Sequence, residues 1–507
     1  MTKVTATISQ TKVTAGITQL NVEAAISQSL VTAGIDRTVV VPTITVGADK
    51  DVLTINEAIA LATDNYTIII DAGTYNESLD LTTKKLNFVG LGVLETIIYY
   101  QNLSTASAST VNIGKNCTFT NIIFDKIVTG SADNPVVNIS ACNPVFTDCI
   151  IRHEGDQNQV QNLVTIADAS HVVMTDCIIE GWNFGNAVTI TDTSTLNFTG
   201  TKFKAKLLVE DSAVTNIDTD TFYTDSTNNR LGLEASDNTE VYLKINTREI
   251  HWNYATNSEY PTGAYGGSSY KLSGNSYLEL SGNQITGSTR ISGSGVIVLY
   301  KDIVSTLGRF WCETSGNDGT ALVTFDNCQI VMDWDNDVIG SHIIEEVVGA
   351  EIRIINGSVL EFSGHNGNWF TMGNPITCKG KLYIRDSSII DNCNDNIPYG
   401  VNYPQAIKMT DSIIDIEDCT ITNQNWDGVG TNSLLAFWKL PGGHININLK
   451  NVIFNNSEIN SVPFGYLNFG DPLDGDDYIC QEGLTNNSTA DIFNPMADWV
   501  TLTGNCP

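Results

Sequence analysis

The sequence predicts an all-β fold, a right-handed single-stranded parallel β-helix in which short strands stack as successive coils. Two internal repeats and the composition support this prediction. A nine-residue repeat occupies the first 40 residues, and a longer one, mostly of 24 to 33 residues, runs through most of the remaining chain. Charged residues are only 16% of the 507, whereas Thr, Asn, Ser and Gly are abundant, as in long β-rich chains.

The nine-residue repeat has the form Val-x-Ala-x-Ile. Its valines recur from Val4 to Val40, and the alternation has the period of a strand with one buried face. Because one thin sheet of this kind buries little surface, we expect residues 1–45 to form a β arm that becomes ordered against sister chains or a larger assembly. A flexible Thr/Ser-rich tail is the alternative.

The longer repeat shares a six-residue motif: apolar, variable, Asn/Asp/Gly, small or apolar, variable, apolar. Its copies begin at Phe119, Phe146, Met174, Phe198, Phe325, Ile355, Ile384, Ile416 and Leu449. Asn, Asp and Gly tolerate the left-handed backbone conformation, so a bend at position three lets positions one, four and six all point inward. Position four then stacks in the core, which predicts inert buried thiols, and not metal ligands, at Cys149, Cys177, Cys328 and Cys419.

The segment before the first copy indicates how the coil begins. Thr54-Ile-Asn-Glu57 is a capping box for a short amphipathic helix, and the stretch Gly73-Thr-Tyr75-Asn-Glu77 follows it. A helix at the open end followed by short strands resembles the entry of the pectin-lyase-like superfamily. The resemblance covers about residues 48–458, and the Gly73–Glu77 stretch is similar to the opening motif of pectin methylesterases. It implies a β-helix with an amino-terminal capping helix.

Three parts of the chain are expected. Residues 1–45 are the β arm, and residues 46–458 are the β-helix trunk, with distorted coils or inserted hairpins over about 205–310. From about residue 459 the repeat stops, and Gly, Pro and Asp indicate a carboxy-terminal cap over 459–507. Cys480 and Cys506 are a candidate disulfide within that cap.

The charge balance excludes several partners. A formal net charge of −31 argues against nucleic acid, against anionic membrane surfaces, and against a polyanionic substrate without a bridging cation. No run of 18 apolar residues is present, so we expect no membrane insertion. The first residues lack the apolar run of a secretory signal, which predicts synthesis in the cytoplasm.

The loops after the shared motif are the candidate site, because a solenoid aligns equivalent loops along one edge. This predicted loop edge carries acids and indoles, which suit a sugar chain through hydroxyl acceptors and ring faces. The glycan-binding candidates are Trp182, His365, Trp369, Trp426 and Asp427, and the catalytic candidates, as paired carboxylates for glycoside hydrolysis, are Glu180, Asp391 and Asp395. Alternatively, the acids satisfy turn backbone groups and the indoles pack under loops.

Two further motifs predict weaker sites. Asp333, Asp335 and Asp337 would suit Ca²⁺ through carboxylate oxygens, with a solvated loop as the alternative; no other cofactor is expected. Leu307-Gly-Arg309-Phe-Trp311 resembles the Leu-Gly-Arg-Pro-Trp motif of pectin methylesterases, which would make Arg309 and Trp311 substrate contacts. The two catalytic Asp motifs of that family have no counterpart here, so the nucleophile and the acid of an esterase are missing.

A parallel β-helix behind a short repetitive arm resembles bacteriophage tailspikes and tail fibres. This resemblance implies a homotrimer located on the virion, attached to other virion structural proteins through residues 1–45, with a trunk that binds host cell-surface polysaccharide. A secreted-type polysaccharide-active enzyme (lyase, hydrolase or esterase) of the pectin-lyase-like superfamily and a purely structural virion decoration fibre are the alternatives.

Overall fold

The computed structural model describes residues 41–503, except for 93, 103–107, 129–133, 154–161, 182–186, 225–231, 254–257, 261–267, 284, 286, 293–294, 306–309, 315–320, 334–343, 364–375, 393–406, 411–412, 424–432, 439–445, 457–461, 467–477 and 488–500. The nine-residue repeat and Cys506 therefore lie outside the described residues.

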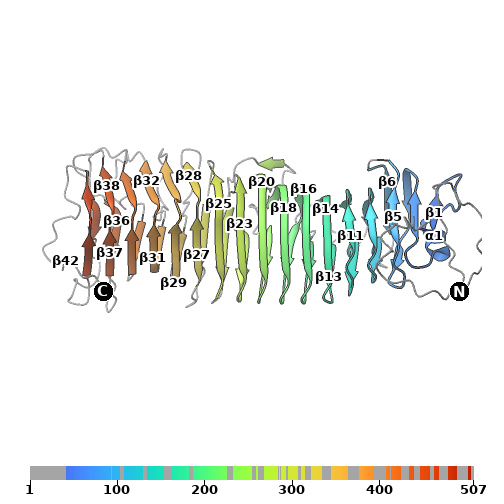
Figure 1. Cartoon of the computed structure of the whole chain (residues 1–507), viewed down its shortest axis with the longest axis horizontal. Helices are drawn as coiled ribbons and strands as arrows, with labels where there is room; N and C mark the ends of the chain where they lie inside the picture. The colour runs from blue at the N-terminus through green and yellow to red at the C-terminus, as the bar shows by residue number, and fades with distance from the viewer. Residues whose placement is uncertain are drawn as a thin grey trace, which may run out of the picture. The chain divides into compact units, whose positions relative to one another are not determined.

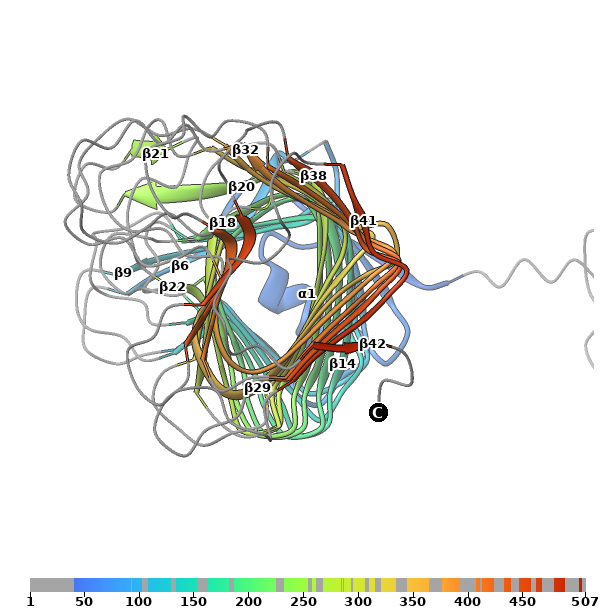
Figure 2. The same cartoon turned by 90° about the vertical axis from the view of Figure 1, so that its left-hand side faces the viewer.

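The described chain is a right-handed parallel β-helix. Apart from β21 (Ser258–Tyr260), the strands pair in parallel with their equivalents in the neighbouring coils. Viewed from the carboxy-terminal end, the coils enclose a common interior (Figures 1 and 2). The pairings form three stacks of strands. The predicted fold class is confirmed.

The first stack holds β4 (Leu79–Leu81), β7 (Val111–Ile113), β10 (Val137–Ser140), β13 (Asn162–Ala167), β15 (Ala187–Ile190), β17 (Lys206–Val209), β19 (Leu233–Ala235), β22 (Ser268–Ser273), β24 (Gly287–Ser292), β26 (Phe310–Thr314), β33 (Ile407–Thr410), β36 (Ser433–Trp438) and β39 (Val462–Tyr466). The second holds β1 (Thr43–Val46), β2 (Thr67–Ile70), β5 (Asn87–Gly90), β8 (Thr118–Thr120), β11 (Val145–Thr147), β27 (Leu322–Asp326), β34 (Ile413–Glu417), β37 (Asn446–Lys450), β40 (Tyr478–Glu482) and β42 (Thr501–Thr503).

The third stack holds β3 (Gly73–Asn76), β6 (Thr96–Asn102), β9 (Ile123–Val128), β12 (Ile150–Arg152), β28 (Gln329–Asp333), β30 (Val359–Ser363), β32 (Ser388–Asn392), β35 (Thr420–Asn423), β38 (Ile453–Asn456) and β41 (Thr485–Asn486). Some strands continue round a corner. Those shared by the second and third stacks are β14 (His171–Glu180), β16 (Thr195–Lys204), β18 (Val214–Thr224), β20 (Glu240–Asn253), β23 (Tyr277–Asn283) and β25 (Ile297–Ser305); the first and second share β29 (Ile344–Ile355) and β31 (Ile376–Arg385).

The bend at position three of the shared motif is present. The backbone has φ between 50° and 56° at Asn121, Asp148, Asp176, Asn327, Asp386, Asp418 and Asn451. Positions one, four and six are buried in these copies, for example at Phe146, Cys149 and Ile151. A left-handed residue resets the alternation of the strand, as the motif predicts.

Two copies differ from the predicted pattern. In the copy that starts at Ile355, the turn takes two left-handed residues, Asn356 and Gly357, so the buried apolar residue before it is Ile354 and the motif begins one residue earlier. In the copy at Phe198, position four is Thr201, which is exposed. The corner there is turned within the continuous strand β16.

The core is one continuous stack of apolar side chains. Phe119 stacks on Phe88 and on Phe146, one coil away on either side, with ring centroids 5.1 Å and 4.9 Å apart. The four position-four cysteines are buried and form no disulfide. Burial raises the pKa of Cys328 and of Cys419 to about 11, so both stay protonated and behave as small hydrophobes.

The first coil carries the helix α1 (Ile55–Leu61). Thr54 accepts a hydrogen bond from the Glu57 backbone and Glu57 accepts one from the Thr54 backbone, so the predicted capping box is formed. Ile55, Ala58 and Ile59 are buried in the core, where the helix contacts β1 and β2. Among the described residues, no helix is long and apolar enough to cross a membrane.

The strand pairings place the boundaries differently from the sequence. The first coil begins at β1, whose residue Thr43 falls within the predicted arm. Beyond residue 458, β40 still pairs in parallel with β37, and β42 with β40, so the stacking continues into the predicted cap. Cys480 is buried and disulfide-bonded. Within 205–310 the antiparallel pair of β20 with β21 (Ser258–Tyr260) is an inserted hairpin.

Candidate functional site

Most of the predicted loop edge lies outside the described residues. This holds for Trp182, His365, Trp369, Asp395, Trp426 and Asp427, and also for Arg309, Asp335 and Asp337. Of the remaining candidates, Asp391 lies in β32, Asp333 ends β28, and Trp311 lies in β26 opposite Ser288. Among the described residues, no group of three or more His, Cys, Asp and Glu side chains is placed to hold a metal ion.

Glu180 is described, and it belongs to a row of alternating charges. It pairs in register with Arg152 on one side and with Lys204 on the other. Lys202 Nζ lies 2.7 Å from its Oε1, and Arg152 Nε lies 3.0 Å from Asp125 Oδ2. The carboxylate of Glu180 thus forms an ion pair that links two successive coils.

Beside this row, His153 and Lys126 form a buried polar cluster. His153 is 3% exposed and Lys126 is fully buried. Nδ1 of His153 lies 2.5 Å from the Lys126 carbonyl oxygen. Since a carbonyl only accepts, Nδ1 carries the proton and donates it, and Nε2 has no partner among the described residues. Lys126 Nζ donates to the Asn134 carbonyl at 2.7 Å, and burial lowers the pKa of Lys126 to about 8.

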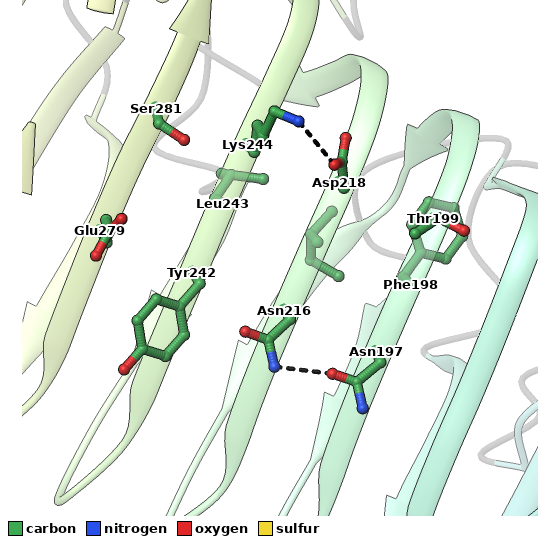
Figure 3. A pocket seen from close by; sticks show the side chains of 11 residues that line it. Asn197, Phe198, Thr199, Asn216, Asp218, Tyr242, Leu243, Lys244, Glu279 and Ser281 are labelled. Carbon is green, nitrogen blue, oxygen red and sulfur yellow. Dashed lines mark hydrogen bonds and ion pairs between the residues drawn. The ribbon is translucent and has the colours of Figure 1, made fainter. Parts of the chain in front are cut away.

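A groove on the described part of the chain brings polar and aromatic side chains of successive coils together. It lies on the outer surface of the second stack, has a volume of about 340 Å³, and crosses β16, β18, β20 and β23 (Figure 3). Two rows of outward-pointing side chains line it, and the register places each row across the four strands. One row is Asn197, Asn216, Tyr242 and Glu279; the other is Thr199, Asp218, Lys244 and Ser281.

The groove therefore runs along the coil axis, across the strands. Successive coils lie roughly 4.8 Å apart, so the four strands span about 14 Å, whereas along any one strand the groove takes at most three residues. We call it the axial groove. Phe198, Ile217 and Leu243 lie between the two rows and also line the groove, while their side chains are buried in the core.

Polar side chains in the axial groove are held by one another. Asn216 donates its amide to Asn197 Oδ1 at 2.8 Å, and Lys244 Nζ donates to Asp218 Oδ2 at 2.9 Å (Figure 3). Asn246 donates to the other Asp218 oxygen at 2.6 Å. Burial acts to raise the pKa of Asp218, but the hydrogen bonds from Lys244 and Asn246 outweigh it, so its pKa is lowered and the group stays ionised.

Two tyrosines lie together at one side of the groove. The rings of Tyr242 and Tyr277 have centroids 5.4 Å apart and are tilted by 51°. The Tyr242 hydroxyl donates to Glu240 at 3.1 Å, and that of Tyr277 donates to Glu279 at 2.9 Å. Burial, with these carboxylates as the next causes, raises the pKa of both tyrosines, so they remain neutral hydroxyls.

The axial groove was not predicted from the sequence. The predicted loop edge follows the third stack, whereas the groove lies on the second stack, before the bend. The sequence does show the alternation of outward polar and inward apolar residues, as in Tyr277-Leu-Glu279-Leu. This alternation indicates a strand, but it does not show which strand lies beside it. Only the register between coils brings Tyr242 next to Glu279.

No protein-family profile matches this chain, and no curated protein matches it. Among solved structures, a carrot pectin methylesterase is similar at 14% identity and a TM-score of 0.17, covering 84% of this chain and 89% of the other. The A-module of a mannuronan C-5 epimerase from Azotobacter vinelandii has 11% identity, a TM-score of 0.19, and coverage of 89% and 94%. An alginate lyase has 11% identity, a TM-score of 0.14, and coverage of 89% and 98%. Function therefore rests on this chain's own residues.

Proposed function

We propose that this protein binds a linear polysaccharide in the axial groove. The observation that carries the proposal is the arrangement of two polar rows and a tyrosine across four successive strands. A polymer lying along the coil axis would meet a new pair of side chains at every coil, roughly every 4.8 Å. A linear chain of sugar units suits such a repeating surface.

The side chains favour hydroxyl groups as ligands. Asp218 and Glu279 offer carboxylate acceptors, whereas Lys244, Ser281 and Thr199 offer donors. A sugar hydroxyl both donates and accepts, and the CH face of a sugar ring packs on an aromatic ring such as Tyr242.

An extended peptide is a poorer ligand for this surface. Peptides that add to a sheet use backbone groups at a free strand edge. The strands under the axial groove are each paired on both sides, β18 with β16 and β20, and β20 with β18 and β23. Their backbone donors and acceptors are therefore used within the coil, and a ligand must be recognised by side chains.

We propose that the axial groove binds a polysaccharide and does not cleave its glycosidic bonds. A glycoside hydrolase needs one carboxyl group that is protonated and able to act as an acid. Asp218 is held ionised by Lys244 and Asn246, and Glu279 accepts a hydrogen bond from Tyr277. We also propose that the protein is a virion spike. In that role it would bring the axial groove to a host cell-surface polysaccharide.

Affinity electrophoresis against a panel of linear polysaccharides tests the proposal, with Tyr242→Ala as the variant. Loss of the ring is expected to weaken binding roughly tenfold. Tyr383→Ala is the matched control, because Tyr383 is also a half-buried outward tyrosine, in β31, but does not line the groove. If both variants bind as tightly as the unchanged protein, or if no polysaccharide binds, the proposal is wrong.

A further inference from the structure

We infer that the axial groove accepts uncharged polysaccharides and excludes those whose sugar units carry carboxylate or sulfate groups. This inference rests on the proposed function and adds the chemical class of the ligand. It follows from the way in which the charges of the groove are paired.

The cation that lines the groove, Lys244, is already in an ion pair. Lys244 Nζ lies 2.9 Å from Asp218 Oδ2, within the groove itself. The charge of this ammonium group is offset by Asp218, so a carboxylate on a sugar would gain little net attraction from it and would lie beside the Asp218 carboxylate. Asn246 also donates to Asp218 at 2.6 Å, which holds that carboxylate in place.

The carboxylates in and beside the groove outnumber the cations. Asp218 and Glu279 line it, and Glu240 lies against Tyr242. Opposite them stand Lys244 and, on the next coil, Lys301, whose Nζ is 3.9 Å from Glu279. The local balance is thus negative, and the whole chain has a formal charge of −31. A polyanion would meet like charge both locally and at long range.

A neutral sugar meets no such penalty. Its hydroxyls can donate to the oxygens of Asp218 and Glu279 while the ion pair with Lys244 stays intact. Hydrogen bonds to charged acceptors are stronger than neutral ones, so the same acids that repel a polyanion would strengthen the binding of hydroxyl groups. Charge on the ligand therefore decides between attraction and exclusion.

The test compares matched polymers. Each neutral linear polysaccharide of the panel is used as it is and after oxidation of its primary hydroxyls to carboxylates, which keeps the backbone and adds the charge. At low salt, the neutral form is expected to bind at least tenfold more tightly than its oxidised form. The ratio is expected to shrink at 0.5 M NaCl, because salt screens the repulsion.

Asp218→Asn sharpens the test, because it removes one negative charge and releases Lys244. In Asp218→Asn, the preference for the neutral form is expected to fall at least threefold. Lys244→Gln provides no free cation, so this variant is expected to keep the preference for the neutral form. Equal or tighter binding of the oxidised polymers by the unchanged protein would overturn the inference and leave the proposed function standing. Binding of neither form would overturn both.

Discussion

Gly200 lies directly against the carbonyl oxygen of Cys177 in the preceding coil. A Cβ at residue 200 would stand 1.8 Å from that oxygen, and the two residues are partners in the register of β14 and β16. No side chain fits in that space unless the backbone moves. This contact explains why the motif copy at Phe198 has glycine at position three, where most copies have Asn or Asp.

Gly200→Ala should therefore lower the free energy of unfolding by about 3 kcal/mol, a value typical of overpacked sites. Gly357→Ala is the control: Gly357 has φ +78°, but no atom lies within 4 Å of the added Cβ. It should cost only the left-handed strain, about 1 kcal/mol. Urea unfolding followed by far-UV circular dichroism measures both. Equal losses in the two variants would mean that the close contact does not matter.

The left-handed bend at position three makes a second prediction. Asp148 has φ 52° at the corner between β11 and β12. Asp148→Ala should lower the free energy of unfolding by about 1 kcal/mol, because alanine tolerates this conformation less well. Asp148→Gly should be better tolerated than Asp148→Ala, since glycine adopts positive φ without strain. The same urea experiment checks the order, and a glycine variant less stable than the alanine variant would contradict it.

These bends also show how much of the fold could be predicted. The Asn, Asp or Gly at position three has an intrinsic backbone preference, so the sequence alone predicts the corner and the buried cysteines behind it. The predicted motif copy at Ile355 starts one residue too late, and this has a physical cause. Asn356 and Gly357 both tolerate positive φ, and the motif does not distinguish a turn of one left-handed residue from a turn of two. The close approach of Gly200 to Cys177 joins two coils and was not visible in either copy alone.

The candidate site was less predictable than the fold. The sequence makes Glu180 a catalytic candidate from its place after a motif, but it does not show that the ion-pair partner of Glu180, Lys202, comes from the next coil. Likewise, the axial groove depends on the register that places Asn216, Tyr242 and Glu279 side by side. Neighbouring side chains in the groove are 19 or more residues apart in the sequence, and local patterns contain no information about such neighbours.

His153 predicts how stability depends on pH. Burial lowers the pKa of His153, with the nearby Lys126 ammonium acting in the same direction, while the hydrogen bond to the Lys126 carbonyl and the charge of Asp125 oppose it. Arg152 lies beside Asp125 and is positively charged as well. The unfolded chain, whose histidine has a pKa near 6.5, then binds a proton before the folded chain does.

The stability that comes from neutral His153 is therefore complete above about pH 6.5 and is lost as the pH falls toward the lowered pKa of the folded state. In His153→Gln, the fall in melting temperature between pH 7.5 and pH 5 should be smaller than in the unchanged protein. His171→Gln is the control, because His171 is exposed. Equal slopes in all three proteins would show that His153 does not titrate on unfolding.

The amino-terminal arm predicts the state of assembly. The Val-x-Ala-x-Ile units of the first 40 residues are expected to bury their apolar face in a homotrimer, whose three copies share one core. Light scattering after size exclusion should give the mass of a trimer for the full chain and that of a monomer after removal of residues 1–41, which leaves β1 intact. A monomer in both cases would remove the physical reason for the virion-spike interpretation.

The most direct test of the axial groove is the dependence of affinity on ligand length. Oligosaccharides of increasing length, prepared from the neutral polysaccharide that binds best, would be titrated by calorimetry. Because the groove crosses four strands, affinity should rise with each added sugar until the ligand spans about 14 Å and then level off, and in Tyr242→Ala every affinity should be lower. An affinity that is independent of length, and unchanged by Tyr242→Ala, would show that the ligand does not lie along the coil axis.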